Sequence, residues 1–161
     1  IDGDAVRNAL RGNIDLRSVL AEYTPDWSST DGRIYGFMAA KAAINDRNIA
    51  KIAFTASAFE IRYRSRGYLF GLFPMSFPVL VRVVPVAESL ESRISVKLPW
   101  YRFFVRELFT AHGLREDIDQ VLKTEMAQVA TNVTDPNLIL FDAVTKYLRS
   151  KIGTLADTVG Q

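Results

Sequence analysis

The sequence contains no cysteine and only one histidine, His112, among its 161 residues. Without cysteine, the chain cannot form a disulfide, a zinc–thiolate site or an iron–sulfur cluster. A lone histidine cannot build a metal site that needs several histidines. His112 precedes Gly113, where we expect a helix to end, and its cationic form suits that position. These absences exclude chemistry, but they assign no compartment to the protein.

The sequence also lacks a long apolar run. Its longest stretch without a charge covers residues 67–81 and is broken by two glycines and two prolines. That stretch is shorter than the roughly 20 residues a membrane-spanning helix needs. No glycine-rich phosphate loop or nucleophile elbow occurs either. The acidic run at residues 115–119 fits the first turn of a helix and lacks the spacing of a calcium loop. We therefore predict a non-enzymatic protein with no catalytic residue, no metal site and no cofactor.

The composition is that of an ordinary globular protein, with 48% hydrophobic and 24% charged residues. A chain of this length fits one domain, so we predict a single domain over residues 1–161. The first residue is not methionine, and a fragment of a longer protein is compatible with that.

Hydrophobic periodicity predicts an α+β fold. Helical spacing predominates at both ends of the chain, and strict alternation predominates in the middle third. We predict a three-stranded antiparallel sheet, with N-terminal helices and two or three C-terminal helices packed on one face. The expected strands cover residues 59–64, 77–83 and 93–98. The expected helices begin near residues 4, 15, 33, 100, 114 and 136, with Asp4 as the expected cap of the first, and Asp135-Pro136 is typical of a helix start. In the helix that begins at Trp100, the apolar residues Trp100, Phe103, Phe104 and Leu108 fit one stripe that runs up to His112.

Basic residues are expected to gather on one face of this sheet. Residues 51–110 carry nine basic and four acidic side chains, although the whole chain has a net charge of only +2. Clustered guanidinium groups bind phosphate and carboxylate well. The alternative is a solvated face that Glu60, Glu88 and Glu91 neutralise. Strand alternation places five basic side chains on the face away from the core: Arg62, Arg64, Arg82, Arg93 and Lys97.

The connection between the first two strands is unusually apolar and aromatic. Large apolar side chains beside arginine are suited to a membrane interface or to a groove on a partner protein. The alternative is that these side chains fold back and belong to the core. The candidate segment comprises Arg66, Tyr68, Leu69, Phe70, Leu72, Phe73, Met75 and Phe77.

The same segment shares a basic residue, a glycine and aromatic residues with the signature of the RNA-recognition motif. It departs from that signature at Leu69 and Gly71, and the expected order of elements also differs. We therefore do not expect a nucleic acid partner.

Two functional hypotheses remain open at this point. The first is an interaction domain that engages a protein partner or a membrane surface through the aromatic hairpin tip, which favours a membrane-associated or extracytoplasmic location. The second is a domain that binds a small anion, such as phosphate, on the basic sheet face. The sequence alone does not predict an oligomeric state.

Overall fold

The fold is built around an antiparallel sheet whose strands follow one another in the order β1-β2-β3-β4. The structure is a computed structural model and describes residues 1–12, 15–23, 30–55, 58–85, 92–106, 109–128 and 135–153. The α+β class and the antiparallel sheet are as predicted. The elements are α1 (Gly3–Arg11), α2 (Leu16–Tyr23), α3 (Thr30–Asn45), β1 (Ile49–Thr55), β2 (Ala58–Leu69), β3 (Phe73–Pro85), β4 (Ser92–Lys97), the 3-10 helix η1 (Trp100–Phe104), β5 (Val105–Arg106), α4 (Ala111–Gln128), α5 (Pro136–Leu148) and the π-helical turn η2 (Arg149–Gly153).

The predicted count of three strands is wrong, because the sheet has four long strands and β1 was missed. The two-residue strand β5 also pairs with β2. The pattern of β1 is concealed by a bulge, since the register with β2 shifts between Ile49 and Lys51. The buried residues Ile49 and Ile52 are therefore three positions apart, whereas a regular strand would separate them by an even number.

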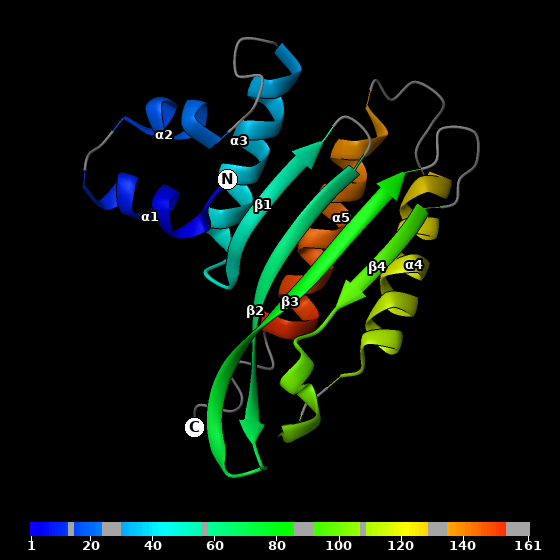
Figure 1. Cartoon of the computed structure of the whole chain (residues 1–161). Coiled ribbons are helices and arrows are strands. Elements are labelled where there is room, and N and C mark those ends of the chain that lie inside the picture. The colour runs from blue at the N-terminus through cyan, green and yellow to red at the C-terminus, as the bar shows by residue number, and fades with distance from the viewer. Residues whose placement is uncertain are drawn as a thin grey trace.

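Strands β2 and β3 form one long hairpin that extends beyond the rest of the sheet (Figure 1). Its register runs without a shift from Phe59↔Val83 to Leu69↔Phe73. Pro78 fits within β3 because it pairs with Arg64, whose backbone N–H points away from β3 to the carbonyl oxygen of Asn48. The backbone nitrogen of Pro78 therefore faces the β4 side of β3. The pairing with β4 ends at Leu80, so no ladder hydrogen bond is lost at Pro78.

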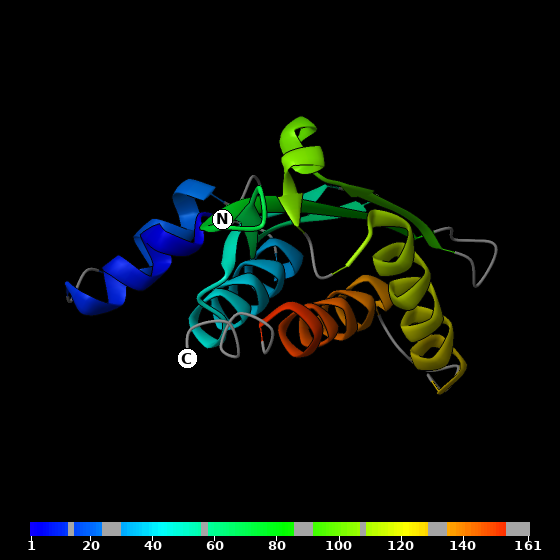
Figure 2. The ribbon, with the colours of Figure 1, turned by 90° about the horizontal axis from the view of Figure 1, so that it is seen from below.

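Helices α3, α5 and α4 form a layer along one face of the sheet, and this layer does not cover the opposite face (Figure 2). The apolar side chains of alternate strand positions, among them Phe59, Ile61 and Val81, meet the helices in one continuous core. Helix α5 starts as predicted, since the Asp135 carboxylate accepts a hydrogen bond from the Asn137 backbone N–H at 2.9 Å. The uncovered side is called the open face below.

Helices α1 and α2 lie beyond the β1 edge of the sheet (Figure 1). Helix α1 is capped by Asp2 rather than by Asp4, and Asp2 accepts hydrogen bonds from the Asp4 and Ala5 backbone N–H groups. The Arg7 guanidinium donates to the Ala43 and Ile49 carbonyl oxygens at 2.7 and 3.1 Å. These bonds satisfy carbonyl groups at and just after the C-terminus of α3, and they fix α1 against β1.

The segment after β4 differs most from the prediction. An apolar helix was expected from Trp100 to Leu108, ending near His112. Instead, η1 covers only five residues and leads into β5, and α4 begins at Ala111. His112 therefore lies in the first turn of a helix rather than in the last turn. A cation is unfavourable in the first turn because of the helix dipole. Its Nε2 atom lies 3.0 Å from a carboxylate oxygen of Glu116. Leu108 lies outside the described residues.

Candidate functional site

Six large apolar side chains are exposed together at the far end of the β2–β3 hairpin and on η1. Phe73, Trp100 and Phe103 are 64%, 79% and 81% exposed, and the exposed fractions of the other three lie between 49% and 74%. Exposed apolar groups that gather at one place mark an interaction surface far more often than single ones do. We call this set the tip cluster: Phe70, Leu72, Phe73, Trp100, Phe103 and Phe104.

Two chain segments that are about 30 residues apart form the tip cluster, and backbone hydrogen bonds join them. Strand β5 pairs with the end of β2 through Tyr68↔Arg106 and Leu69↔Val105. The Phe70 N–H then donates to the Phe104 carbonyl oxygen at 2.7 Å, and the two rings meet edge to face with centroids 5.6 Å apart. The exposed rings are therefore held on a hydrogen-bonded scaffold.

The turn of the hairpin has a backbone conformation that Phe70 does not favour. Phe70 and Gly71 have φ angles of 53° and 74°, and the Leu72 N–H donates to the Leu69 carbonyl oxygen at 3.0 Å. Two positive φ angles in succession are the pattern of a type I′ turn, in which Asn or Gly normally takes the first position. A bulky side chain there costs about 1–2 kcal/mol. This cost points to a role for the ring at the surface, since the ring is mostly exposed.

The structure divides the predicted tip residues into two groups. Phe70, Leu72 and Phe73 are exposed at the turn, and Arg66 is exposed on β2. The remaining four point back into the molecule to different degrees. Phe77 is buried, Leu69 and Met75 pack against the core, and Tyr68 is half-buried.

Sequence reasoning missed the contribution of η1. Trp100, Phe103 and Phe104 were expected to face the core as one stripe of a helix. A signal against this was present, because Trp100, Tyr101, Phe103 and Phe104 leave Arg102 as the only polar residue of the five, so no polar face is defined. The Arg102 guanidinium lies over the Phe103 ring, 5.2 Å from its centroid.

A shallow hollow of about 540 Å³ adjoins the tip cluster between η1 and the start of α4. Phe103, Val105 and Phe109 line it with apolar groups, and Arg102 and His112 lie at its border. The cluster therefore has both projecting rings and a neighbouring depression, with the Arg102 guanidinium at its margin.

The open face carries the predicted basic residues. Arg62, Arg82, Arg93 and Lys97 are exposed. The register aligns Lys51, Arg62, Leu80 and Lys97 across four strands, and Arg82 stands opposite Glu60 in the adjacent row. Within the described part of the chain, no ion pair neutralises these four predicted residues. Glu88 and Glu91 lie outside the described residues.

Arg64 differs from the other four, because it is paired with Asp4 of α1. The second guanidinium nitrogen of Arg64 lies 3.3 Å from the other carboxylate oxygen of Asp4, and Arg7 contacts the same carboxylate at 2.8 Å. The Arg64 hydrogen bond, with that from Arg7, lowers the pKa of Asp4 well below its usual range. Arg64 therefore attaches α1 to the sheet and is not free to bind an anion.

The described residues contain no group of three or more histidine, aspartate or glutamate side chains placed to hold a metal ion. No helix in the same ranges is long and apolar enough to cross a membrane.

Comparisons with known proteins give no family for this chain. No protein-family model matches the sequence, and no curated protein or solved structure matches it significantly. The functional argument therefore depends on the geometry of the tip cluster and of the open face.

Proposed function

We propose that this domain is a non-enzymatic interaction domain that attaches to an anionic membrane surface through the tip cluster. The observation that carries the proposal is the exposure of six large apolar side chains on a hydrogen-bonded scaffold formed by two separate segments. Phe and Trp side chains on a projecting loop enter the boundary between lipid headgroups and acyl chains, where apolar rings leave water.

The apolar gain available to the tip cluster is large enough for peripheral binding. Full burial of one large apolar side chain is worth about 1.5–3 kcal/mol. Six partly exposed side chains therefore offer of order 5–10 kcal/mol before the costs of association are subtracted. For comparison, a single myristoyl chain supplies about 5.5 kcal/mol, which gives marginal and reversible attachment.

Charge supports an anionic rather than a neutral membrane. The Arg102 guanidinium lies over the exposed Phe103 ring, and Arg66 is exposed on β2, where it pairs with Ser76 of β3. Helix η1 stands on the open side of the sheet, opposite to α3, α5 and α4, which is also the side of the basic residues on the open face (Figure 2). Each basic residue close to an anionic bilayer contributes about 1 kcal/mol, and salt weakens this attraction.

The test is flotation with neutral and with anionic vesicles at low and high salt. We expect binding that requires anionic lipid and weakens with salt. Phe73→Ser combined with Phe103→Ser should reduce the bound fraction at least about tenfold, because two exposed rings are removed from the interface. Phe37→Ser is the matched control, since Phe37 is also half-exposed but lies on α3.

Equal loss of binding in the Phe37 control would show that general apolar exposure, not the tip cluster, drives attachment. Absence of binding to anionic vesicles would overturn the membrane proposal. A protein partner that receives the same rings would then be the occupant to test.

A second candidate function is supported by the row of cations on the open face. Arg62 and Arg82 are exposed on adjacent strands and no ion pair neutralises either in the described ranges, so they could hold a small anion between them. Inorganic phosphate should then raise the melting temperature, since a ligand of the native state stabilises it by RT ln(1 + [L]/Kd). Arg62→Gln with Arg82→Gln should abolish that shift, and no shift in the unmutated protein would exclude this function.

A further inference from the structure

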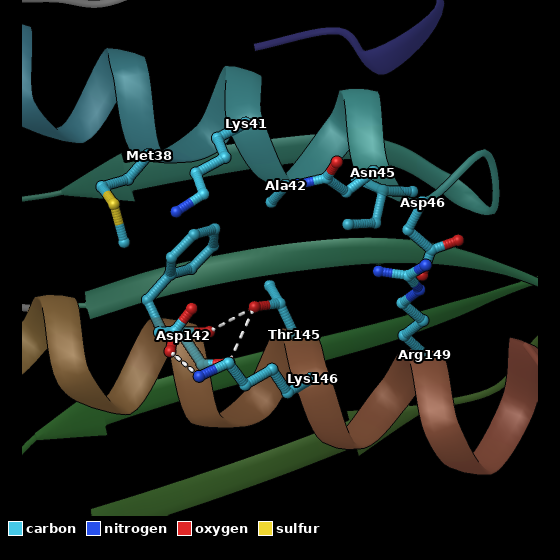
Figure 3. Close-up of a pocket in the computed structure, with 11 residues that line it drawn as sticks. Met38, Lys41, Ala42, Asn45, Asp46, Asp142, Thr145, Lys146 and Arg149 are labelled. Carbon is cyan, nitrogen blue, oxygen red and sulfur yellow. Dashed lines mark hydrogen bonds and ion pairs between the residues drawn. The ribbon is translucent and has the colours of Figure 1, made fainter.

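Helices α3 and α5 enclose a pocket of about 240 Å³ on the helical side of the sheet, away from the open face (Figures 2 and 3). The apolar part of its lining includes Met38 from α3, Ile49 from β1 and Phe141 from α5. Its polar part comes from Lys41 and Asn45 on one side and from Lys146 and Arg149 on the other.

The pocket has more positive charge than its own carboxylates engage. Lys146 is paired with Asp142 at 2.6 Å. Asp46 accepts hydrogen bonds from the Tyr63 hydroxyl at 2.6 Å and from the Asn48 backbone N–H at 2.9 Å. The donors to Asp46 are neutral, so its negative charge remains, and the three cations of the lining (Lys41, Lys146 and Arg149) exceed the two carboxylates by one.

The two remaining cations have no such partner. Among the described residues, neither Lys41 nor Arg149 forms an ion pair or a side-chain hydrogen bond. Figure 3 shows the Lys41 side chain extending from α3 toward α5, and the Arg149 side chain extending back toward the end of α3. Two cations without an ion pair among the described residues thus border one small cavity whose lining is partly apolar.

The size and charge of the pocket restrict the class of ligand. Sites for drug-sized molecules usually measure about 300–1,000 Å³, so a cavity of 240 Å³ suits a smaller molecule than a nucleotide. A phosphate monoester carries about −1.5 to −2 charges at neutral pH and has three acceptor oxygens, which matches two cations. Arg149 can supply a planar pair of donors and Lys41 a point charge, while an apolar substituent can contact Met38 and Phe141.

We propose that the pocket between α3 and α5 binds a small phosphate monoester, with Arg149 and Lys41 holding the phosphate and the apolar lining receiving the organic group. This site is separate from the tip cluster and from the open face. It gives the domain a ligand that can be tested without membranes.

The test is a calorimetric titration with phenyl phosphate, inorganic phosphate and benzoate. Phenyl phosphate should bind most tightly, because it has both the double charge and the apolar ring. Lys41→Gln and Arg149→Gln should each weaken its binding about tenfold or more, since each removes a charged hydrogen-bond donor. Both side chains are exposed, so the folded state should survive the changes, and an unchanged melting temperature checks this.

Two control variants locate the binding. Arg115→Gln, an exposed change on α4, should leave the affinity unchanged. The double variant Arg62→Gln with Arg82→Gln should also bind phenyl phosphate normally, because those residues lie on the open face. Loss of binding in that double variant would place the anion on the open face and overturn the proposal. An affinity for phenyl phosphate in Lys41→Gln and Arg149→Gln that equals that of the unmutated protein would overturn it as well, and so would the absence of binding to the unmutated protein at millimolar concentration.

Discussion

Phe73 and Phe77 lie four residues apart on β3, so both side chains project from the same face of the strand. Phe77 is 1% exposed and Phe73 is 64% exposed. Phe77 contacts the Phe109 ring, with centroids 6.4 Å apart, and belongs to the core. Phe73 is four residues nearer the turn than Phe77 and remains mostly exposed. Strand alternation thus fixes the direction of a side chain, whereas burial depends on what the rest of the chain places over it.

The same contrast holds for the two halves of the β2–β3 hairpin. In the half near β1 and β4, the inward residues Ile61, Tyr63 and Val81 are completely buried. In the far half, beyond Phe77, the end of β2 pairs with β5, and Phe70 in the turn contacts Phe104 of η1. We infer that the near half stabilises the fold and that the far half is available for binding. The predictions below test that division.

The largest expected effect is on folding stability at Phe77. Phe77→Ala should lower the free energy of unfolding by about 3–5 kcal/mol, because it leaves a cavity in the core. Phe73→Ala should lower it by less than about 1 kcal/mol, because the removed ring is mostly in water. Urea denaturation of the two variants measures both values. Similar losses at both positions would show that the far half of the hairpin also belongs to the core.

A smaller effect is expected at Tyr63, which is buried in the near half and donates to Asp46 at 2.6 Å. Tyr63→Phe should cost about 1–3 kcal/mol, because it removes a donor from a buried carboxylate. Leu72→Ala in the far half is the matched comparison and should cost much less, since Leu72 is exposed. A cost at Tyr63 no greater than that at Leu72 would contradict the assignment.

The same tyrosine predicts a pH dependence. Burial, followed by the hydrogen bond with Asp46, raises the pKa of Tyr63 far above its usual value. The native state therefore keeps this proton at pH values where the unfolded chain loses it. Its contribution to stability is complete below about pH 10 and falls as the pH rises further. Tyr63→Phe should make the decline in stability above pH 10 less steep, as measured by denaturation at several pH values.

Substitution of Phe70 has two opposing effects on the free energy of unfolding. Phe70→Asn produces an Asn-Gly pair, which a type I′ turn favours, so about 1 kcal/mol of strain should be relieved. The edge contact with Phe104, worth about 0.5–1.5 kcal/mol, is lost at the same time. The free energy of unfolding should therefore change by no more than about 1 kcal/mol, while vesicle binding falls. A large destabilisation would mean that Phe70 supports the fold.

The smallest effect is expected at Asp4, where α1 meets the open face. Asp4→Asn should cost only about 0.5 kcal/mol at neutral pH, because the ion pair with Arg64 is half-exposed. The pKa of Asp4 is lowered by its pairing with Arg64 and Arg7, so this contribution is present above about pH 4 and is lost as the pH falls below it. Denaturation at pH 7 and at several pH values below 4 should show the full difference between variant and parent at pH 7 and a progressively smaller difference as the pH falls toward the lowered pKa of Asp4. Increased phosphate binding in the variant would show that the pair competes for Arg64.

The sequence predicted the parts of the fold whose pattern is regular. Phe59, Ile61 and Tyr63 alternate without interruption, and both their strand and their inward direction were predicted correctly. Strand β1 was missed because its bulge puts Ile49 and Ile52 out of phase. Neither strand nor helix periodicity can detect such a shift, since its cause is the pairing with another strand.

The candidate site was accessible to sequence analysis only in part. The apolar turn around Phe70 was visible because Gly67, Gly71 and Pro74 surround it. The place of η1 beside that turn depends on the pairing of β5 with β2, which joins residues far apart in the chain. Phe77 and Phe73 have the same pattern in the sequence, and only the tertiary structure separates them.

The most direct test of the central claim is the fluorescence of Trp100 in the presence of vesicles. The protein has two tryptophans, and the Trp27→Phe variant leaves Trp100 as the only one. Trp100 is 79% exposed, so its emission in buffer should be that of a ring in water. On addition of anionic vesicles, we predict a shift to shorter wavelength and quenching by lipids with brominated acyl chains. Emission that stays unchanged at saturating vesicle concentration would contradict the insertion of the tip cluster into the membrane surface.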